Sequence, residues 1–264
     1  MARQIVVIPN LFTSFLAEPP SLNPHYHSVR AESEQWLVTS SECNYKMQKK
    51  IHSIDFSYFC AVLAPKANYE RFRLICDWGN WIFPFDDLFD DGILRENAAQ
   101  AAILIERVLS TMQDEQDRSA TIPTSAESEQ RLVDCHMDIW QRFKSGTDVA
   151  GLRERYVYAM QEYCDGALRQ VEDCSMGQVR SPEDLLVVRR SSIGAQPLFA
   201  LVEYGHQLDI PRSVFENETI NQIKVLGVDL ILIQNDIVSY HKEEVSCSSV
   251  ALEKTTLPTL LTIT

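Results

Sequence analysis

The stretch WIFPFDDLFDD (residues 81–91) places four carboxylates within six positions, directly after large apolar residues. On a helix, side chains four positions apart lie on one face, so Asp86 neighbours Asp90 and Asp87 neighbours Asp91. Like charges at this spacing repel, and the cluster costs stability unless a cation or partner offsets it. Capping of a helix N-terminus accounts for two of the acids at most. Carboxylates arranged this way suit Mg²⁺, a hard cation that prefers oxygen ligands.

A second set of oxygen-bearing side chains lies in NDIVSYHKEE (residues 235–244). Asn235, Ser239 and Glu243 are spaced by four and four, so they fall on one stripe of a helix. Such residues are also common on solvated faces, but the preceding run VLGVDLILI is too apolar all round for a helix with a broad exposed side. Lys242 offers a positive charge to a phosphate. Facing each other across a cavity, the two clusters would hold several Mg²⁺ ions that bridge to a diphosphate.

The composition is that of a globular protein, and its charge limits the partners. The 264 residues are 45% hydrophobic and carry 24 Lys and Arg against 37 Asp and Glu, a net charge of −13. This balance disfavours nucleic acid and anionic membranes as partners, although metal cations still allow a phosphorylated ligand. Seven cysteines without a CxxC pair indicate buried thiols in a reducing compartment. No run of 18 apolar residues and no convincing signal peptide occur, so we expect a cytoplasmic protein without a membrane-spanning helix.

Helical periodicity dominates from about Val29 onward, and no alternating strand pattern competes with it. We therefore expect an all-α fold, one domain over residues 1–264, with helices around a common core. Residues 8–28 hold four prolines and predict an irregular segment lying over that core. Residues 113–130 predict an exposed linker. Proline within the apolar segment before the first cluster predicts a kinked or restarted helix there.

The two clusters together resemble those of class I terpene synthases, in particular fungal sesquiterpene synthases of the basidiomycete type. FPFDDLFD resembles the aspartate-rich DDxxD motif, which maps Asp86, Asp87 and Asp90 as metal ligands. A longer spacing seen in some members brings in Asp91 instead. NDIVSYHKE matches the NSE motif N(D/E)xxSxxKE at every defined position. This match maps four further residues: the metal ligands Asn235, Ser239 and Glu243, and the diphosphate contact Lys242.

VVRRSSIGA resembles the family's effector region, in which an arginine senses the diphosphate. The sensor usually lies 46 positions before the NSE asparagine, which selects Arg189 here. Its neighbour Arg190 points about 100° away on a helix, so the two cannot face one pocket equally. The apolar residues just before them leave the facing ambiguous. By the same resemblance, Ser192 is the linker and Ile193–Gly194 the effector segment.

The resemblance implies a carbon–oxygen lyase that acts on farnesyl diphosphate. Three Mg²⁺ ions, with Arg189 and Lys242 as catalytic residues, neutralise the departing diphosphate, and the carbocation then cyclises. Water quenches such a cation, so the pocket has to be dry. Aromatic faces stabilise passing positive charge. Phe83 is the expected substrate contact and Trp78 and Phe59 are further candidates, although core packing is the commoner role of a single aromatic residue.

The chain departs from the family pattern after the NSE motif. Family members continue through several more helices, one of which carries an Arg-Tyr pair that grips the diphosphate, and no such pair follows here. Residues 245–264 are rich in Ser and Thr and have lost the long-helix pattern, so we expect a truncated terpene synthase bundle that lacks its last helices. Two alternatives stay open: a non-catalytic homologue, and a chain-elongating prenyltransferase, which the NSE motif disfavours. A monomer and a homodimer are both compatible with the sequence.

Overall fold

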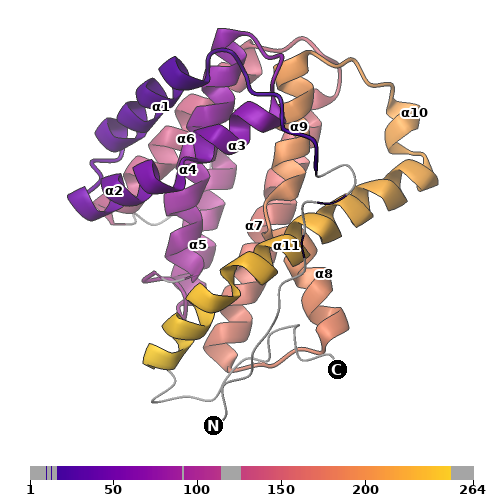
Figure 1. Cartoon of the computed structure of the whole chain (residues 1–264). Helices are drawn as coiled ribbons and strands as arrows, with labels where there is room; N and C mark the ends of the chain where they lie inside the picture. Colours follow the sequence, from indigo (N-terminus) through magenta and orange to yellow (C-terminus); the bar gives the residue numbers. More distant parts are fainter. Residues whose placement is uncertain (1–9, 11–12, 14–16, 91, 114–125, 251–264) are drawn as a thin grey trace.

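The computed structural model describes residues 10, 13, 17–90, 92–113 and 126–250, without the side chains of residues 240–250. Across these residues the chain forms α-helices and no strand (Figure 1). The helices are α1 (Tyr26–Ser40), α2 (Tyr45–Ile54), α3 (Phe56–Leu63), α4 (Tyr69–Asp90), α5 (Ala98–Ser110), α6 (Glu127–Ser145), α7 (Leu152–Met176), α8 (Pro182–Ser192), α9 (Ala195–His206), α10 (Arg212–Phe215) and α11 (Glu218–Val250). The side chains of Asp91, Lys242 and Glu243 lie outside this description.

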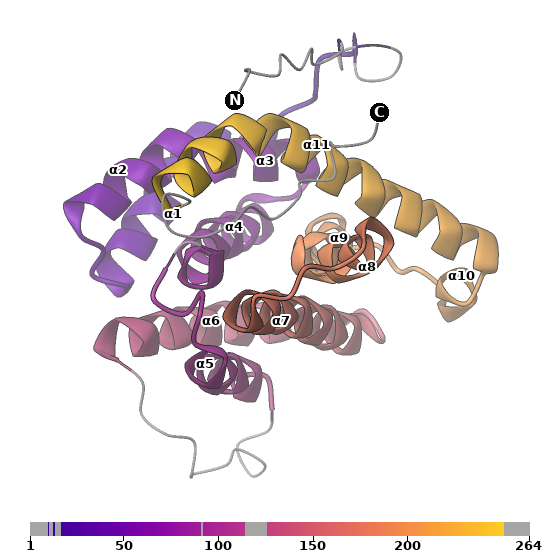
Figure 2. The ribbon, with the colours of Figure 1, turned by 90° about the horizontal axis from the view of Figure 1, so that it is seen from below.

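Helix α4 is the centre of the bundle. It contacts α1, α2 and α3 on one side and α6, α7 and α9 on the other (Figure 2). Its sequence suits this position, because apolar residues cover several faces of the helix rather than one stripe. Large fully buried side chains of α4 include Phe72, Trp78, Trp81 and Phe85. The residues that carry the first acidic cluster therefore form the end of a central helix, most of whose residues are buried.

Contrary to the expectation of a restart, α4 continues without a break through Gly79 and Pro84. Burial explains the continuity, since Trp81 and Phe85 on either side of the proline are both fully buried and hold the helix against its neighbours. Gly79 serves close packing instead of a break. A Cβ there would lie 2.6 Å from a ring carbon of Phe56 and 2.7 Å from the sulfur of Cys60, so only glycine lets α3 approach this closely.

Several predicted boundaries shift in the structure. Helix α1 starts at Tyr26, and α2 was not predicted. Before α1, the Asn23 side-chain amide donates to the carbonyls of Ala64 at 2.7 Å and Ala67 at 2.9 Å, which ties the described part of the N-terminal segment to the core. Most of the predicted linker 113–130 lies outside the described residues, and its last four residues already belong to α6.

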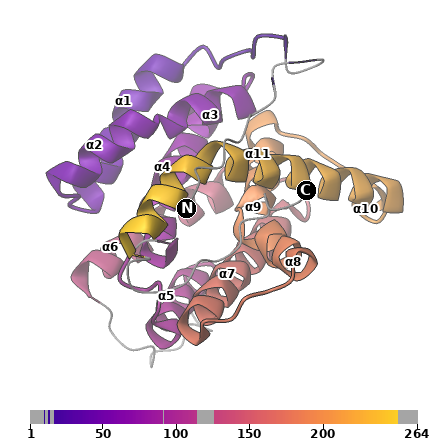
Figure 3. The same ribbon diagram turned by 60° about the horizontal axis from the view of Figure 1, so that its bottom comes forward.

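Helix α11 is an outer element that crosses the bundle obliquely from its start beside α10 (Figures 2 and 3). The sequence predicted no broad exposed side, and this was wrong: Leu226, Leu230 and Ile233 are each at least 45% exposed. Among the described side chains of α11, Val228 and Leu232 form a narrow covered face that packs with Ala195. The helix also runs to Val250, so the loss of helical structure expected from residue 245 does not occur over its first six residues.

The stretch Pro182–His206 contains an 18-residue window with a mean hydropathy of 1.3, which by length and composition alone is apolar enough to cross a membrane. In the structure it is not one helix, because the chain breaks at Ile193–Gly194 between α8 and α9. Gly194 has a φ of +73°, a conformation that favours glycine. Side chains of α9 then enter the core, where Leu201 is fully buried. The apolar character of this stretch therefore reflects packing within the bundle.

A buried carboxylate joins α4 to α6. Asp77 is fully buried, and its two oxygens accept from Arg73 and from Arg142, each at 2.8 Å. Arg142 also pairs with Asp138, which is half exposed. Because an unpaired buried charge is far more costly than a broken surface pair, the two partners of Arg142 should differ strongly in their contribution to stability.

We expect Asp77→Ala to lower the free energy of unfolding by about 3 kcal/mol, because two partly buried guanidinium groups lose their shared partner. Asp138→Ala removes an exposed partner of the same Arg142 and should cost less than about 1 kcal/mol. Urea unfolding followed by circular dichroism measures both. Equal losses in the two variants would contradict a structural role for the buried carboxylate.

Candidate metal and diphosphate site

The first acidic cluster lies at the carboxyl end of α4. Asp86 and Asp87 are half-buried and Asp90 is exposed, while the intervening Phe89 is buried. The helix thus turns its aromatic residues into the core and its carboxylates toward the end of the bundle. The predicted neighbours Asp86 and Asp90 do influence one another electrostatically. The spacing argument from the sequence is therefore reproduced in the geometry.

Asp86 has a strongly perturbed carboxyl group. Burial raises its pKa from 3.8 to about 7, and the negative charge of Asp90 adds to the rise. A hydrogen bond from Tyr163 and the positive charge of Arg189 act in the opposite direction. The Tyr163 hydroxyl donates to Asp86 Oδ1 at 2.6 Å. Asp86 of α4 is therefore in direct contact with α7 and within the electrostatic influence of α8.

Tyr163 was not predicted from the sequence. It is buried on α7, and burial together with the charge of Asp86 raises the pKa of its hydroxyl, which stays protonated as a donor. Its ring also lies 3.7 Å from the position that a Cβ on Gly194 would occupy. The same side chain thus contacts the acidic cluster and the break between α8 and α9. Tyrosine is too common in helices for this position to stand out in one sequence.

Lys50 of α2 is a second residue that the motifs did not reveal. Its ammonium forms an ion pair with Asp87 Oδ2. It also lies 4.9 Å from the centre of the Phe83 ring, which is half-buried one turn before Asp87. The expected substrate contact Phe83 is therefore covered by a protein cation. The other two aromatic candidates differ in their exposure: Trp78 is buried in the core, whereas Phe59 is 42% exposed on α3.

The structure distinguishes the two adjacent arginines of α8. Arg189 donates to Asp236 Oδ1 at 2.5 Å and reaches Asn235 Oδ1 at 3.5 Å, at the start of the NSE motif. Arg190 binds Asp229 instead, with contacts of 2.6 and 2.9 Å to its two oxygens. Only Arg189 appears among the charges that act on Asp86. Arg189 is therefore the arginine that contacts the start of the NSE motif, and its role as the diphosphate sensor stays a prediction.

The second cluster lies on α11, where Asn235 is exposed and Ser239 is half-buried. Within the described side chains, no three His, Cys, Asp or Glu residues lie close enough to hold a metal ion without other ligands. The donors that do converge around Arg189 are oxygen atoms from carboxylates and an amide. Such a set suits a hard divalent cation such as Mg²⁺, and the guanidinium between them suits an anionic diphosphate. The residues present thus fit the metal that the motifs imply.

Ser192, the expected linker residue, is buried at the end of α8. A Cβ on Gly166 of α7 would lie 2.6 Å from the Ser192 backbone nitrogen, so glycine allows α7 and α8 to pack closely here. This contact fixes the start of the Ile193–Gly194 segment next to Tyr163. The predicted effector segment, Ile193–Gly194, forms the break between α8 and α9 and lies against Tyr163, the residue that binds Asp86.

The family model "Terpene synthase family 2, C-terminal metal binding" matches residues 77–252, two thirds of the chain. The chain belongs to terpene synthase family 2. The matched region contains the acidic end of α4, both arginines of α8 and the described part of the NSE motif. The family's description implies binding of a metal. The subgroup suggested by the motifs, the basidiomycete type, stays a prediction.

Individual relatives agree with this assignment. The chain is 34% identical over 242 residues to silphinene synthase from Penicillium patulum, covering 90% of this chain and 64% of that protein. It is 32% identical over 245 residues to cycloaraneosene synthase from Sordaria araneosa, covering 92% and 65%. The chain thus spans just under two thirds of the length of these relatives.

A solved structure supports the fold. The SVS_A2 protein from ancestral sequence reconstruction superposes with a TM-score of 0.75 at 23% identity, over 84% of this chain and 66% of that one. The prediction of an all-α class I terpene synthase fold is confirmed.

The hydrogen bond from Tyr163 should matter for metal binding. We expect Tyr163→Phe to weaken binding of Mn²⁺, used as a spectroscopic substitute for Mg²⁺, about tenfold, because Asp86 loses the donor that stabilises and orients its ionised form. Tyr156→Phe is the matched control, since Tyr156 is also buried on α7 but its hydroxyl faces His136 at 3.4 Å. Titration by electron paramagnetic resonance measures both; equal affinities in the two variants would argue against this role of Tyr163.

Proposed function

We propose that this chain is the metal-binding part of a terpene cyclase that ionises farnesyl diphosphate and cyclises the resulting carbocation. The observation that carries the proposal is the position of Arg189, which contacts Asn235 and Asp236 of α11 and acts electrostatically on Asp86 of α4. A guanidinium between two sets of oxygen ligands is suited to a diphosphate whose charge is shared with metal ions.

The proposed roles follow from the chemistry of each side chain. The metal ions, when bound, supply the Lewis acidity that stabilises the departing diphosphate. The aspartates of α4 and Asn235, Ser239 and Glu243 of α11 bind them. Arg189 and Lys242 bind the diphosphate oxygens and stabilise the charge that develops as the carbon–oxygen bond breaks. Phe83 and the apolar side chains of α4 exclude water from the prenyl chain.

The choice of farnesyl diphosphate is part of the proposal. Homologues at about 30% identity include both sesquiterpene and diterpene synthases, so family membership leaves the chain length of the substrate open. The NSE-type second motif favours cyclisation over chain elongation, since elongating prenyltransferases carry a second aspartate-rich motif. The sequence resemblance to sesquiterpene synthases favours the C15 substrate.

A second candidate function is binding of prenyl diphosphate and metal without turnover. The exposed apolar side chains of α11 favour it, because a carbocation needs a dry pocket and this helix leaves Leu226 and Leu230 more than half exposed. This alternative keeps the proposed ligands and loses only the catalytic step. The two candidate functions therefore differ in whether a product is formed and not in which ligands the protein binds.

The test is incubation of the purified protein with Mg²⁺ and either farnesyl or geranylgeranyl diphosphate, with products identified by gas chromatography and mass spectrometry. We expect a Mg²⁺-dependent cyclic C15 product and release of diphosphate. If only the C20 substrate gave a product, the substrate would be geranylgeranyl diphosphate and not farnesyl diphosphate. Tight binding with no product from either would establish the second candidate, and a longer linear product on addition of isopentenyl diphosphate would indicate a prenyltransferase.

The two arginines provide a matched pair for the diphosphate site. We expect Arg189→Lys to weaken Mg²⁺-dependent binding of inorganic diphosphate by more than about tenfold, because a point charge does not reproduce the planar two-donor geometry of guanidinium. Arg190→Lys should change it little, since Arg190 faces Asp229. Isothermal titration calorimetry measures both without requiring turnover. A loss confined to Arg190→Lys would show that the sensor is the other arginine.

A further inference from the structure

Lys50 is joined to the acidic cluster by two contacts from a helix outside all the recognised motifs. Its ammonium pairs with Asp87 Oδ2, and it lies over the face of Phe83 at 4.9 Å from the ring centre. The Lys50 and Asp87 side chains are 33% and 22% exposed. An ammonium that pairs with a carboxylate and also lies over an aromatic ring makes two favourable contacts. These contacts offset the conformational entropy that the lysine side chain loses by staying in one conformation. The pair is therefore more than a chance contact of a mobile surface lysine.

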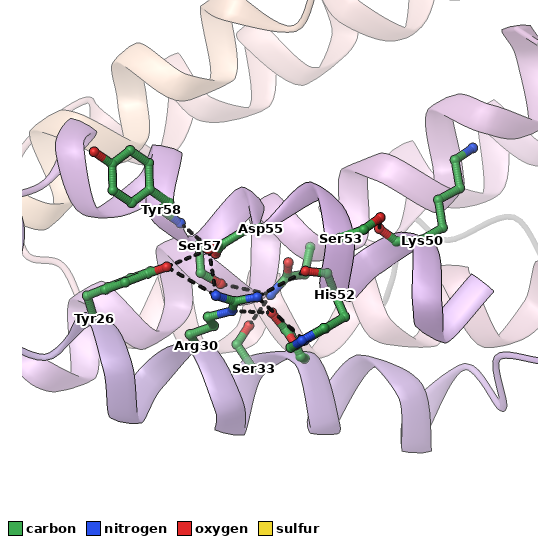
Figure 4. Close-up of polar contacts among 11 residues, drawn as sticks. Tyr26, Arg30, Ser33, Lys50, His52, Ser53, Asp55, Ser57 and Tyr58 are labelled. Carbon is green, nitrogen blue, oxygen red and sulfur yellow. Dashed lines mark hydrogen bonds and ion pairs between the residues drawn. The ribbon is translucent and has the colours of Figure 1, made fainter. Parts of the chain in front are cut away.

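The neighbouring chain fixes the direction of α2. Asp55 ends α2 and caps α3 in a left-handed conformation, with φ of +52°. Its carboxylate accepts from Arg30 at 2.6 Å and from the Tyr26 hydroxyl at 2.5 Å, and Arg30 also donates to the carbonyl of His52 at 2.9 Å. Figure 4 shows this cluster, with Lys50 extending away from it on another side of α2. These contacts fix the end of α2 against α1 and thereby set the direction in which the Lys50 side chain extends.

The ion pair changes what Asp87 can offer to a metal ion. A carboxylate whose charge is compensated by an ammonium has a weaker field at its neighbours. It is also a weaker ligand, because a cation that binds Oδ2 must displace the ammonium, and one that binds the other oxygen meets a carboxylate whose charge is already partly neutralised.

We propose that Lys50 is a positioning residue that keeps Asp87 paired within the protein and out of divalent-cation coordination. The inference rests on the proposed function, in which the aspartates of α4 bind metal, and it revises the role that the motif assigned to Asp87. Lys50 limits the negative charge of the cluster, so that a cation is held mainly with a diphosphate and less by the empty protein. The metal site is thereby coupled to the N-terminal helices through α2.

The test measures Mn²⁺ binding to the full chain without substrate, by electron paramagnetic resonance. We expect Lys50→Met to bind Mn²⁺ about tenfold more tightly than the parent, because it frees the Asp87 carboxylate and removes a positive charge while retaining the contact with Phe83. Lys50→Arg should bind like the parent, since it keeps the charge. Lys49→Met is the matched control: Lys49 lies on the same helix and packs on the ring of Tyr45 at 4.7 Å.

A double variant separates the electrostatic role from a structural one. Adding Asp87→Asn to Lys50→Met should return the affinity close to that of the parent, because the freed charge is removed again, whereas a general loosening of α2 would not be reversed. Equal or weaker Mn²⁺ binding by Lys50→Met, or an equal gain in Lys49→Met, would overturn the proposal. If Lys50→Met does not fold, Lys50→Gln is measured in its place under the same criteria.

The outcomes are distinguishable from those of the proposed function. Absence of turnover together with the expected shift in Mn²⁺ affinity would overturn the catalytic proposal and leave the role of Lys50 standing. Normal turnover without a shift in Mn²⁺ affinity would overturn the role of Lys50 and leave the catalytic proposal standing. No Mn²⁺ binding by the parent chain or by Lys50→Met, either alone or with inorganic diphosphate, would overturn both.

Discussion

Repulsion among the carboxylates at the end of α4 is the constraint on which the arrangement of this site depends. The helix brings Asp86 and Asp90 onto one face and supplies no positive charge of its own there. Compensation comes from other helices: a hydroxyl from α7, an ammonium from α2 and a guanidinium from α8. Each acts on the cluster from a different side. A metal ion entering such a site meets carboxylates that the protein has already partly neutralised.

The bundle holds these helices with buried polar contacts as well as with its aromatic core. Asp77 ties α4 to α6 through Arg142, and Arg71 of α4 donates to the carbonyls of Tyr204 at 2.6 Å and Gly146 at 2.7 Å. Such contacts have fixed geometry and pin the rotation of α4 about its axis. Rotation decides whether Asp86 faces Tyr163, so packing far from the acidic end contributes to the geometry at that end.

Helix α11 is attached in a different way. Two ion pairs, from Arg189 to Asp236 and from Arg190 to Asp229, join it to α8 beside a small apolar cluster. Partly exposed ion pairs of this kind contribute modestly and are screened by salt. The second set of ligands is thus held less rigidly than the first. In the proposed reaction Arg189 has to serve a diphosphate as well as Asp236, and its position between the clusters suits such an exchange.

The sequence by itself determined the helical class and which residues of each cluster share a helix face. Spacing of four residues sets which side chains share a helix face, whatever surrounds the helix. It also gave the separation of Arg189 and Asn235. Local spacing did not reveal the continuity of α4 through its proline or the exposed apolar side of α11, because neighbours in space decided both.

Only the tertiary structure decided which groups complete the site. Tyr163 lies 77 residues from Asp86 in the chain, and Lys50 lies 37 residues from Asp87. Neither belongs to a motif, and each is an ordinary residue of its own helix. The choice between Arg189 and Arg190 likewise depended on the rotation of α8 against α11. Charge compensation acts through space, and the packing of separate helices alone determines which charges meet.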